Sequence, residues 1–391
     1  MKYDFDRIID RKNTSCLKYD FAVERGKPED VLPLWVADMD ISTAPEIIGA
    51  IKSRAEHGVF GYSMPKRDYF EVVANWFRER HGWNADPEKF ICTPGVVFAI
   101  CTLIRAVTEP DDGVIILQPV YYPFATSITN NKRKLVVSEL KYEGGSYTID
   151  FADFEKKIIE NGVKAFILCS PHNPVGRVWK REELERLGDI CLKHGVFVIA
   201  DEIHADFTFG GHRHLVFPTI KKEFEKTCAV CTSPSKSFNL AGLQISNIYI
   251  PDAAVRKRFE DELDMVGYWE PAIMGMTACV VAYTEGGEWL DGLKKYLAEN
   301  LAFVREYIGA NLPEIKLIEP EGTYLLWLDC RALGLDDMQL QNLAEQKAKL
   351  WLDDGYIFGA GGSGFERINI ACPKKTLEIA LRRLKEAVRA R

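Results

Sequence analysis

Short apolar runs alternate with amphipathic helical patterns through most of this chain, from about residue 91 onward. The apolar runs have the length of strands buried on both faces, and the intervening helices carry their apolar residues on one side. Because parallel strands need helical connections that cover the sheet, this alternation indicates an α/β fold with a mostly parallel sheet. The sequence predicts strands at 114–117, 163–169, 196–200, 228–232 and 245–250, and helices at 45–56, 96–107 and 181–193.

The pattern changes after about residue 251, where longer charged helices replace the short alternation. Glu285, Gly286 and Gly287 mark a predicted boundary between a large unit and a smaller α/β unit. In this second part the sequence predicts helices at 253–266, 290–311, 338–352 and 376–389, and strands at 324–329 and 367–371. Residues 1 to about 47 are predicted to be mostly irregular.

The composition is ordinary for a globular enzyme and argues against several classes of function. The net charge is −7, whereas a nucleic-acid-binding protein needs a basic surface. No apolar run approaches the ~20 residues that span a membrane, and the charged N-terminus has no signal-peptide core. The ten cysteines are scattered, as expected in a reducing compartment. We therefore expect a cytoplasmic protein that binds neither nucleic acid nor membrane.

Two features imitate metal or nucleotide motifs without their context. His204, His212 and His214 lack the regular spacing and the cysteine or carboxylate partners of a zinc site, so we expect no metal. Residues 359–364 match the glycine pattern of dinucleotide-binding proteins, which must follow a strand and open a helix. A strand-like segment follows them here, so we expect a flexible loop near the substrate site.

Lys236 carries the clearest chemical implication in the chain. It lies just after the predicted strand 228–232, among Ser233, Ser235 and Ser237. A bare ammonium is disfavoured in such a place, whereas a lysine joined to an aldehyde as an imine fits it, and the flanking hydroxyls suit a phosphate. A phosphorylated aldehyde cofactor indicates pyridoxal 5′-phosphate (PLP). The alternative is a solvated loop lysine.

Tyr121, Asn173 and Asp201 each come shortly after another predicted strand. Ligands bind beyond the carboxyl ends of the strands in open α/β sheets, so these side chains would converge with Lys236 at one edge. Asp201 would keep a pyridine nitrogen protonated, Asn173 would donate to the phenolic oxygen of the ring, and Tyr121 would stack on its face. The respective alternatives are a helix cap, a turn residue and a core aromatic.

Two further groups suit the anionic parts of a cofactor and a substrate. Gly95, Val96 and Val97 open a predicted helix, where free backbone N–H groups attract a phosphate. Arg367 would bind a substrate carboxylate with its two-pronged guanidinium. Taken alone, the first group is equally a plain turn and the arginine equally a member of a surface salt bridge.

The order of these residues resembles a known family. Asn173-Pro174-x-Gly176, Asp201, Ser-x-Ser-Lys236 and Arg367 occur in the order typical of the class I/II aminotransferase group of fold-type I PLP-dependent enzymes. A narrower resemblance, to the MalY/PatB-type cystathionine β-lyases (C–S lyases), rests on six further motifs. These are Asp10 to Thr14, Lys18 to Asp20, Trp35 to Asp40, Phe60 to Tyr62, Thr93 to Val97 and Asp201 to His204.

The resemblance implies a homodimer with its active sites at the subunit interface, where Tyr62 would reach the cofactor phosphate of the neighbouring subunit. It implies that Ser233 and Ser235 hold the phosphate together with the turn at 95–97, and it places Ala37 at the substrate. It also implies a large PLP-binding domain at 48–285 and a small domain formed by the two ends of the chain. Those ends are 1–47 and 286–391.

Two departures from the aminotransferase pattern favour the lyase subgroup. Aminotransferases usually carry a tyrosine three residues after the ring aspartate, where this chain has His204, which we expect to contact the cofactor. They also usually carry an arginine shortly after the lysine motif, where this chain has Gln244.

The resemblance therefore implies a PLP-dependent cysteine-S-conjugate β-lyase acting on cystathionine or a related S-substituted cysteine. Lys236 would remove the Cα proton, a thiolate would leave from Cβ, and pyruvate and ammonia would follow. Two alternatives stay open at this point. One is an aminotransferase, which shares every step up to proton removal; the other is a PLP-binding regulator that acts through protein partners.

Overall fold

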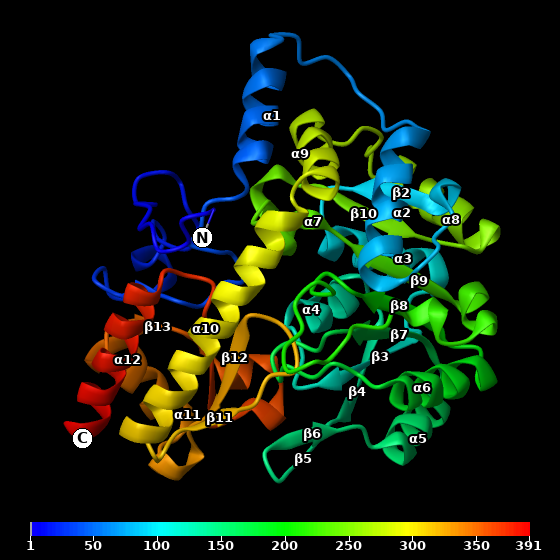
Figure 1. Ribbon diagram of the computed structural model, residues 1–391. Coiled ribbons are helices and arrows are strands. Elements are labelled where there is room, and N and C mark those ends of the chain that lie inside the picture. Colours follow the sequence, from blue (N-terminus) through cyan, green and yellow to red (C-terminus); the bar gives the residue numbers. More distant parts are fainter. Residues whose placement is uncertain (1) are drawn as a thin grey trace.

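The computed structural model describes residues 2–391, and its centre is a seven-stranded sheet (Figure 1). In spatial order the strands are β2 (Phe90–Thr93), β10 (Ser246–Tyr249), β9 (Cys228–Thr232), β8 (Phe197–Asp201), β7 (Val163–Cys169), β3 (Gly113–Gln118) and β4 (Lys134–Glu139). Neighbours from β9 to β4 run parallel, whereas β10 runs antiparallel to both β9 and β2. The predicted α/β fold with a mostly parallel sheet is confirmed.

Helices cover both faces of this sheet because its strands are apolar on both sides. Phe166 of β7 packs in one core with side chains of α5 and α6. Its neighbour Ile167 points the other way and packs with α3, α4 and α8. The bounds of these helices are α3 (Val96–Val107), α4 (Pro123–Asn130), α5 (Phe151–Asn161), α6 (Arg181–Lys193) and α8 (Ala253–Met265).

A second, antiparallel sheet is formed by the C-terminal part of the chain. Its strands, in spatial order, are β11 (Lys316–Ile318), β12 (Leu325–Asp329), β15 (Phe365–Asn369) and β14 (Asp353–Asp354). The long helices α10 (Gly287–Asn311) and α12 (Lys374–Arg389) lie beside it (Figure 1). The predicted strands at 324–329 and 367–371 and the predicted helices at 290–311 and 376–389 are confirmed within a few residues.

The two ends of the chain meet on this second sheet's side of the molecule. β1 (Leu32–Pro33) pairs in parallel with β13 (Leu350–Trp351), and Trp35 stacks on Trp351 with the ring centroids 4.4 Å apart. This pairing supports the division into 48–285 on one side and 1–47 with 286–391 on the other, which stays a prediction.

The helix predicted at 338–352 is confirmed as far as residue 347 and is wrong beyond it. α11 covers only Asp337–Asn342, a π-helical turn follows at Leu343–Lys347, and the chain then enters β13 and β14. Lys349 leaves the helix with a φ of 53°, and the backbone of β13 is satisfied by β1 from the other end of the chain. Because that pairing is long-range, the local periodicity could not reveal it.

Several elements lie outside the sequence predictions. They are α2 (Arg67–His81), the short α7 (Pro234–Ser237), α9 (Ile273–Thr284) and the hairpin β5 (Lys141–Glu143) and β6 (Ser146–Thr148). The predicted helix α1 (Pro45–Glu56) is confirmed, and a strand, β15, does follow the glycine-rich segment 359–364. No helix within residues 2–391 is both long enough and apolar enough to cross a membrane.

Candidate active site

A cavity of about 220 Å³ opens at the carboxyl ends of β7, β8 and β9. Its walls contain almost all of the side chains that the sequence singled out. The predicted residues that line it are Ala37, Gly95, Val96, Val97, Tyr121, Asn173, Asp201, His204, Ser233, Ser235 and Lys236. Segments from six places in the sequence thus meet at one sheet edge, as expected for an open α/β sheet.

Lys236 lies on α7, directly beyond β9, and its position is fixed by a serine. The hydroxyl of Ser233 accepts a hydrogen bond from Ser235 N at 3.0 Å and donates to the Ile245 carbonyl at 2.7 Å. The amine of Lys236 donates to the Ala37 carbonyl at 2.6 Å. Burial, with a contribution from Arg367, lowers the pKa of this amine to about 8. The amine is therefore able to act as a base near neutral pH.

Asp201 ends β8 and is buried, with one carboxylate oxygen accepting from Ile203 N at 3.1 Å. Burial raises the pKa of this carboxyl to about 7. A carboxylate in such an apolar place gains stability from a cationic hydrogen-bond donor. The site therefore suits a protonated ring nitrogen.

His204 lies close to Asp201 and is almost fully buried. Burial, together with the nearby positive charge of Lys236, lowers the pKa of its imidazole to about 3, so the ring is neutral. Its Nδ1 has no hydrogen-bond partner within residues 2–391, and the imidazole makes an edge contact with Tyr324. A buried nitrogen without a partner on the cavity wall is available to a bound group.

The first turn of α3 forms the end of the cavity that suits an anion. The leading N–H groups of a helix have no partner within the helix, and Val96 and Val97 supply them here. A Cβ added to Gly95 would meet no atom within 4 Å. The glycine therefore leaves open space in front of these N–H groups, where a phosphate fits.

Tyr121 and Asn173 also line the cavity and are joined through the backbone, because Tyr121 N donates to the Asn173 carbonyl at 3.0 Å. Burial raises the pKa of the Tyr121 phenol, so the ring stays neutral. The side-chain oxygen of Asn173 accepts from Arg367 Nη1 at 2.9 Å, which leaves its NH₂ group as the free donor.

Arg367 does not line the cavity but lies behind Asn173 on β15. It is 3% exposed, so the alternative of a surface salt bridge is wrong. Besides Asn173, the guanidinium donates to the Trp35 carbonyl at 3.0 Å and to the Asp353 carboxylate. Its Nε has no hydrogen-bond partner in the described part of the chain, so one N–H group of the guanidinium is free to donate to an anion.

Tyr62 stands apart from the other predicted residues. It lies between α1 and α2, its side chain is 95% exposed, and it does not line the cavity of its own chain. A role for Tyr62 at a cofactor therefore depends on a second copy of the chain.

Several cavity residues were not predicted from the sequence. Phe98, Cys169, Ile203, Ala241 and Ile245 also line the cavity. Cys169 and Ile203 adjoin predicted strand ends, so the strand pattern offered a signal for them. For Asp353 and Tyr324, which contact Arg367 and the Ala37 carbonyl, no local pattern gave a signal.

These features together fit PLP: an amine with a lowered pKa, a buried carboxylate for a ring nitrogen, and free N–H groups before an open space for a phosphate. The fold and the site therefore define the class of PLP-binding α/β proteins. The residues described hold no group of three or more His, Cys, Asp or Glu side chains arranged to bind a metal.

Comparison with known proteins identifies the family within that class. The family model described as aminotransferase class I and II matches residues 29–384, so the chain belongs to this family. It is 41% identical to the cystathionine beta-lyase PatB of Bacillus subtilis, over 98% of this chain and 100% of PatB. It is 36% identical to the protein MalY of Escherichia coli, over 99% of each chain.

A solved structure shows the same relationship in three dimensions. Cystalysin from Treponema denticola, which contains a pyridoxal 5′-phosphate cofactor, superimposes with a TM-score of 0.96 at 42% identity over 100% of both chains. The predicted membership of the class I/II group and the predicted resemblance to MalY and PatB are confirmed.

Proposed function

We propose that this chain is a PLP-dependent carbon–sulfur β-lyase that converts an S-substituted cysteine such as cystathionine into a thiol, pyruvate and ammonia. The full-length similarity to PatB, a cystathionine beta-lyase, supports the reaction class. The observation that carries the proposal within the structure is the Lys236 amine, whose lowered pKa and position beside Asp201 suit proton removal.

When bound, PLP supplies an aldehyde that joins amines and a pyridine ring that accepts electron density from the carbon next to the amine. Asp201 would hold the ring nitrogen, and the NH₂ group of Asn173 would donate to the phenolic oxygen. Tyr121 would cover one face of the ring. Ser233 and Ser235, with the N–H groups at the start of α3, would hold the phosphate.

Lys236 would perform the proton transfers. Its amine would hold the aldehyde of PLP when no substrate is bound and would be released when the substrate amine binds there instead. The free amine would then accept the Cα proton, because a pKa of about 8 keeps a substantial fraction neutral near physiological pH. With this proton removed, the Cβ–S bond would break with the thiolate as leaving group, and hydrolysis by water would give pyruvate and ammonia.

Arg367 would hold the α-carboxylate of the substrate and so set the direction of the Cα–H bond. Its guanidinium is already oriented by Asn173, Trp35 and Asp353, and its unpartnered Nε is available for the substrate. Ala37, on the neighbouring wall, would contact the same end of the substrate.

His204 favours the lyase over the aminotransferase reaction. Aminotransferases of this family usually carry a tyrosine at this position, whose phenol donates a hydrogen bond. A neutral, buried imidazole offers a different group to the cofactor. The aminotransferase alternative remains the second candidate, because the family model itself is described as aminotransferase class I and II.

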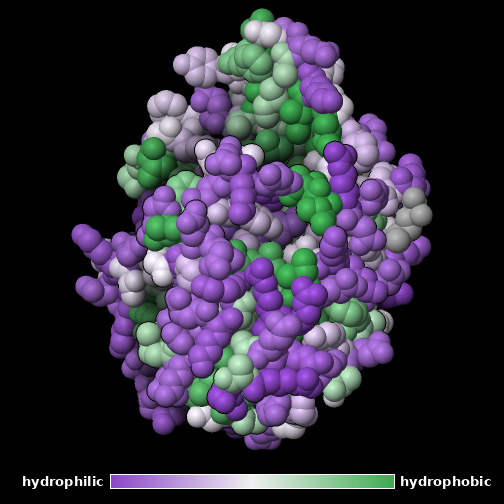
Figure 2. Space-filling model, turned by 90° about the vertical axis from the view of Figure 1, so that its left-hand side faces the viewer, coloured by the Kyte–Doolittle hydropathy of each residue, from purple (hydrophilic) through white to green (hydrophobic). Residues whose placement is uncertain are grey.

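The exposed surface around Tyr62 supports a homodimer. Val59, Phe60, Tyr62 and Met64 are all at least 60% exposed on one segment. Figure 2 shows apolar side chains gathered at the top of the molecule, where Figure 1 places the end of α1 and the segment that follows it. Exposed apolar patches of this kind mark interfaces. We propose that a second copy covers this segment and that Tyr62 there completes the partner's cavity.

The ten cysteines support a cytoplasmic location. All ten are free, and eight of them are buried, which suits a reducing compartment. We propose two partners for the chain: an amino-acid substrate, and a second copy of the chain.

A product assay tests the proposed reaction. Purified protein reconstituted with PLP is incubated with cystathionine, cystine and other S-substituted cysteines, and pyruvate and free thiol are scored together. Equal amounts of both products support the lyase. Amino-group transfer to a keto acid without thiol release would support the aminotransferase instead.

A further inference from the structure

Residues 35–41 form a strap that passes beside the amine of Lys236. Two cavities adjoin the strap: the 220 Å³ cavity described above, and a second of about 610 Å³. Ala37 and Lys236 line both of them. Met39 and Ile41 pack into the core, and Trp35 stacks on Trp351, so the side chains of the strap are held by packing. The backbone around Ala37, which lies between these anchors and borders both cavities, is held in addition by polar contacts.

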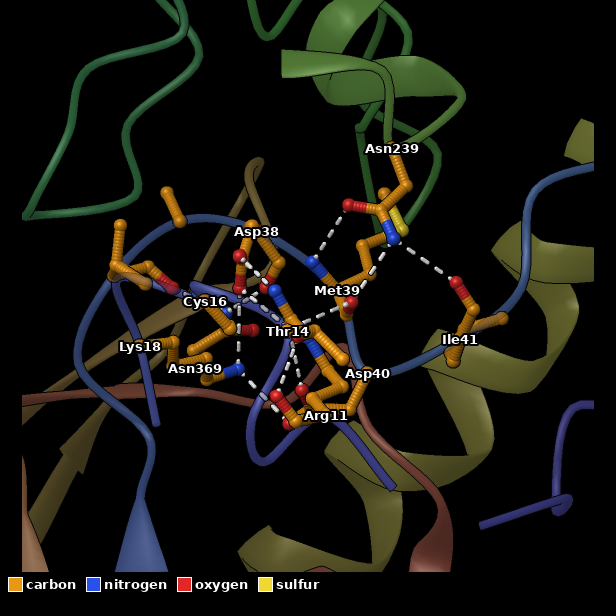
Figure 3. Close-up of polar contacts among 12 residues, drawn as sticks. Arg11, Thr14, Cys16, Lys18, Asp38, Met39, Asp40, Ile41, Asn239 and Asn369 are labelled. Atoms are coloured by element: carbon orange, nitrogen blue, oxygen red, sulfur yellow. Dashed lines mark hydrogen bonds and ion pairs between the residues drawn. The ribbon is translucent and has the colours of Figure 1, made fainter. Parts of the chain in front are cut away.

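Two asparagines hold the backbone of the strap (Figure 3). Asn239, three residues beyond Lys236, accepts from Met39 N at 3.0 Å and donates to the Met39 and Ile41 carbonyls. Asn369, at the end of β15, donates to the carbonyls of Val36 and Asp38. The strap is thus bound to the segments that carry Lys236 and Arg367.

A group of four charges, here called the charge cluster, holds the strap from the N-terminal side, with two of its members buried and two partly buried (Figure 3). Its members are Arg11, Lys18, Asp38 and Asp40. Lys18 is 0% exposed, and its amine lies 2.9 Å from Asp40 Oδ2 and 3.4 Å from Asp38 Oδ1. Arg11 contacts Asp38 Oδ2 at 2.6 Å and Asp40 Oδ1 at 2.7 Å.

The charge cluster contains two positive and two negative charges, and the loop that carries its cations is held in place. A fully buried lysine is rare unless it is paired, and the carboxylates of Asp40 and Asp38 raise the pKa of Lys18 even though burial opposes this. The loop between the two cations is fixed by Asp20, whose carboxylate accepts from the backbone N–H groups of residues 13, 14 and 16. Removing one member would leave an uncompensated buried charge.

The charge cluster connects to the chemistry through Ala37, which lies directly before Asp38. The Ala37 carbonyl accepts from Lys236 Nζ at 2.6 Å and from the Tyr324 hydroxyl at 3.1 Å. A neutral amine that donates one N–H to a fixed carbonyl has its lone pair directed away from that carbonyl. The position of the Ala37 oxygen therefore sets the direction in which the free amine is able to accept a proton.

We propose that Lys18 and Arg11 are positioning residues for the reaction: through Asp38 and Asp40 they hold the Ala37 carbonyl where it orients the free amine of Lys236. This inference rests on the proposed function for its consequence in catalysis. The positioning itself is a property of the apoprotein and is measurable whichever reaction the loaded protein performs.

The first test measures hydrogen exchange of the strap in the apoprotein. The variant is Lys18→Met with Asp40→Asn. Each new side chain is close in size to the one it replaces, so the variant removes one positive and one negative charge and leaves Arg11 paired with Asp38. The amides of Asp38, Met39 and Asp40, which are hydrogen-bonded in the structure, are expected to exchange about tenfold faster. If this variant does not fold, Asn239→Ala, which releases the same strap from its other side, takes its place.

The second test measures the pKa of Lys236 in the same apoprotein, from the pH dependence of the rate at which it captures PLP. The ammonium form loses a carbonyl acceptor when the strap loosens, so this pKa is expected to fall by about 0.5–1 unit. In the reconstituted protein, kcat is expected to fall about tenfold, with KM within about twofold, because orientation and not binding is lost.

The control removes a partly buried ion pair far from the strap in the chain. Arg105, near the end of α3, contacts Glu262 of α8 at 2.6 Å, and the control variant is Arg105→Met with Glu262→Gln. It is expected to leave strap exchange and the Lys236 pKa unchanged. The proposal is overturned if the Lys18 variant behaves like this control. It is also overturned if strap exchange rises while the Lys236 pKa and kcat stay the same, since the charge cluster would then only stabilise the N-terminal segment.

Discussion

The two sides of the active-site cavity are built in different ways. The side that suits PLP is formed mainly by residues at the ends of strands of a single sheet or shortly beyond them, namely Asn173, Asp201, Ser233 and Lys236. The side that suits the substrate is assembled from the strap, from Arg367 on the second sheet and from Asp353 on the adjacent strand. The residues of the first side can be located from the strand pattern of the sequence. The second side forms only when segments that are distant in the sequence pack together in the folded protein. The variants below test that contrast, in order of decreasing effect.

Lys236→Ala is expected to have the largest effect. It removes the only group that we assign to proton transfer at Cα, so kcat/KM for pyruvate formation should fall by about 10⁴-fold. Lys257→Ala, an exposed lysine on α8, is the control and should keep full activity. Retention of more than about a hundredth of the activity in the Lys236 variant would contradict the assignment.

Arg367→Met tests the side that suits the substrate and should damage both stability and activity. It leaves Asp353 buried without its partner, which costs about 3–5 kcal/mol of unfolding free energy. Adding Asp353→Asn should recover most of this stability, measured by urea unfolding, without recovering kcat/KM, which stays down about 10²–10³-fold. If activity returned with stability, Arg367 would be a structural residue only.

Asp201→Asn tests the side that suits PLP and has opposite effects on activity and stability. Loss of the carboxylate should lower kcat/KM about 10²-fold or more. In the apoprotein, burial raises the pKa of Asp201 from 3.8 to about 7, so the folded state holds a proton that the unfolded state has released between these values. Its stability contribution is therefore lost as pH rises from about 4 to 7.

The asparagine variant should consequently be more stable than the parent apoprotein at pH 8, by about 2–4 kcal/mol, and close to it at pH 3. Urea unfolding of both apoproteins at the two pH values measures this difference. A stability difference that does not change with pH would show that Asp201 is ionised in the folded apoprotein.

Gly95→Ala should weaken PLP binding without destabilising the apoprotein. Gly95 has an extended backbone with a φ of 176°, which alanine also adopts, and the added methyl group would meet no protein atom. It would instead occupy the space for the phosphate, so the Kd for PLP should rise about 10–100-fold. Gly309→Ala, at an exposed site of α10 with equal room, should stabilise the protein slightly and leave the Kd unchanged.

Tyr62→Ala is expected to have the smallest effect and tests whether the partner subunit completes the site. The side chain is 95% exposed in one chain, so the unfolding free energy of the isolated chain should not change. The Kd for PLP should rise about tenfold if its hydroxyl contacts the partner's phosphate. Met338→Ala, at an exposed position on α11, is the control. A change in the Tyr62 variant no larger than in this control would separate Tyr62 from the site.

Sequence patterns were sufficient where local periodicity and long-range structure agree. The strands at 163–169 and 228–232 were predicted with their exact bounds, since strands buried on both faces are continuous apolar runs. The last part of the helix predicted at 338–352 was wrong because Leu350 and Trp351 pair with a strand from the other end of the chain. The role of Arg367 at the substrate stays a prediction, and neither its burial nor its pairing with Asp353 was visible in the sequence.

The sequence by itself determined that the chain forms a mostly parallel sheet and that Asn173, Asp201 and Lys236 stand at strand ends, because apolar runs specify strands and parallel strands end at one edge. Only the tertiary structure decided what fixes those groups. The pairing of Lys18 with Asp40, and the contact between Lys236 and the Ala37 carbonyl, join segments distant in sequence. Such contacts gain their strength from burial, which no local pattern of residues encodes.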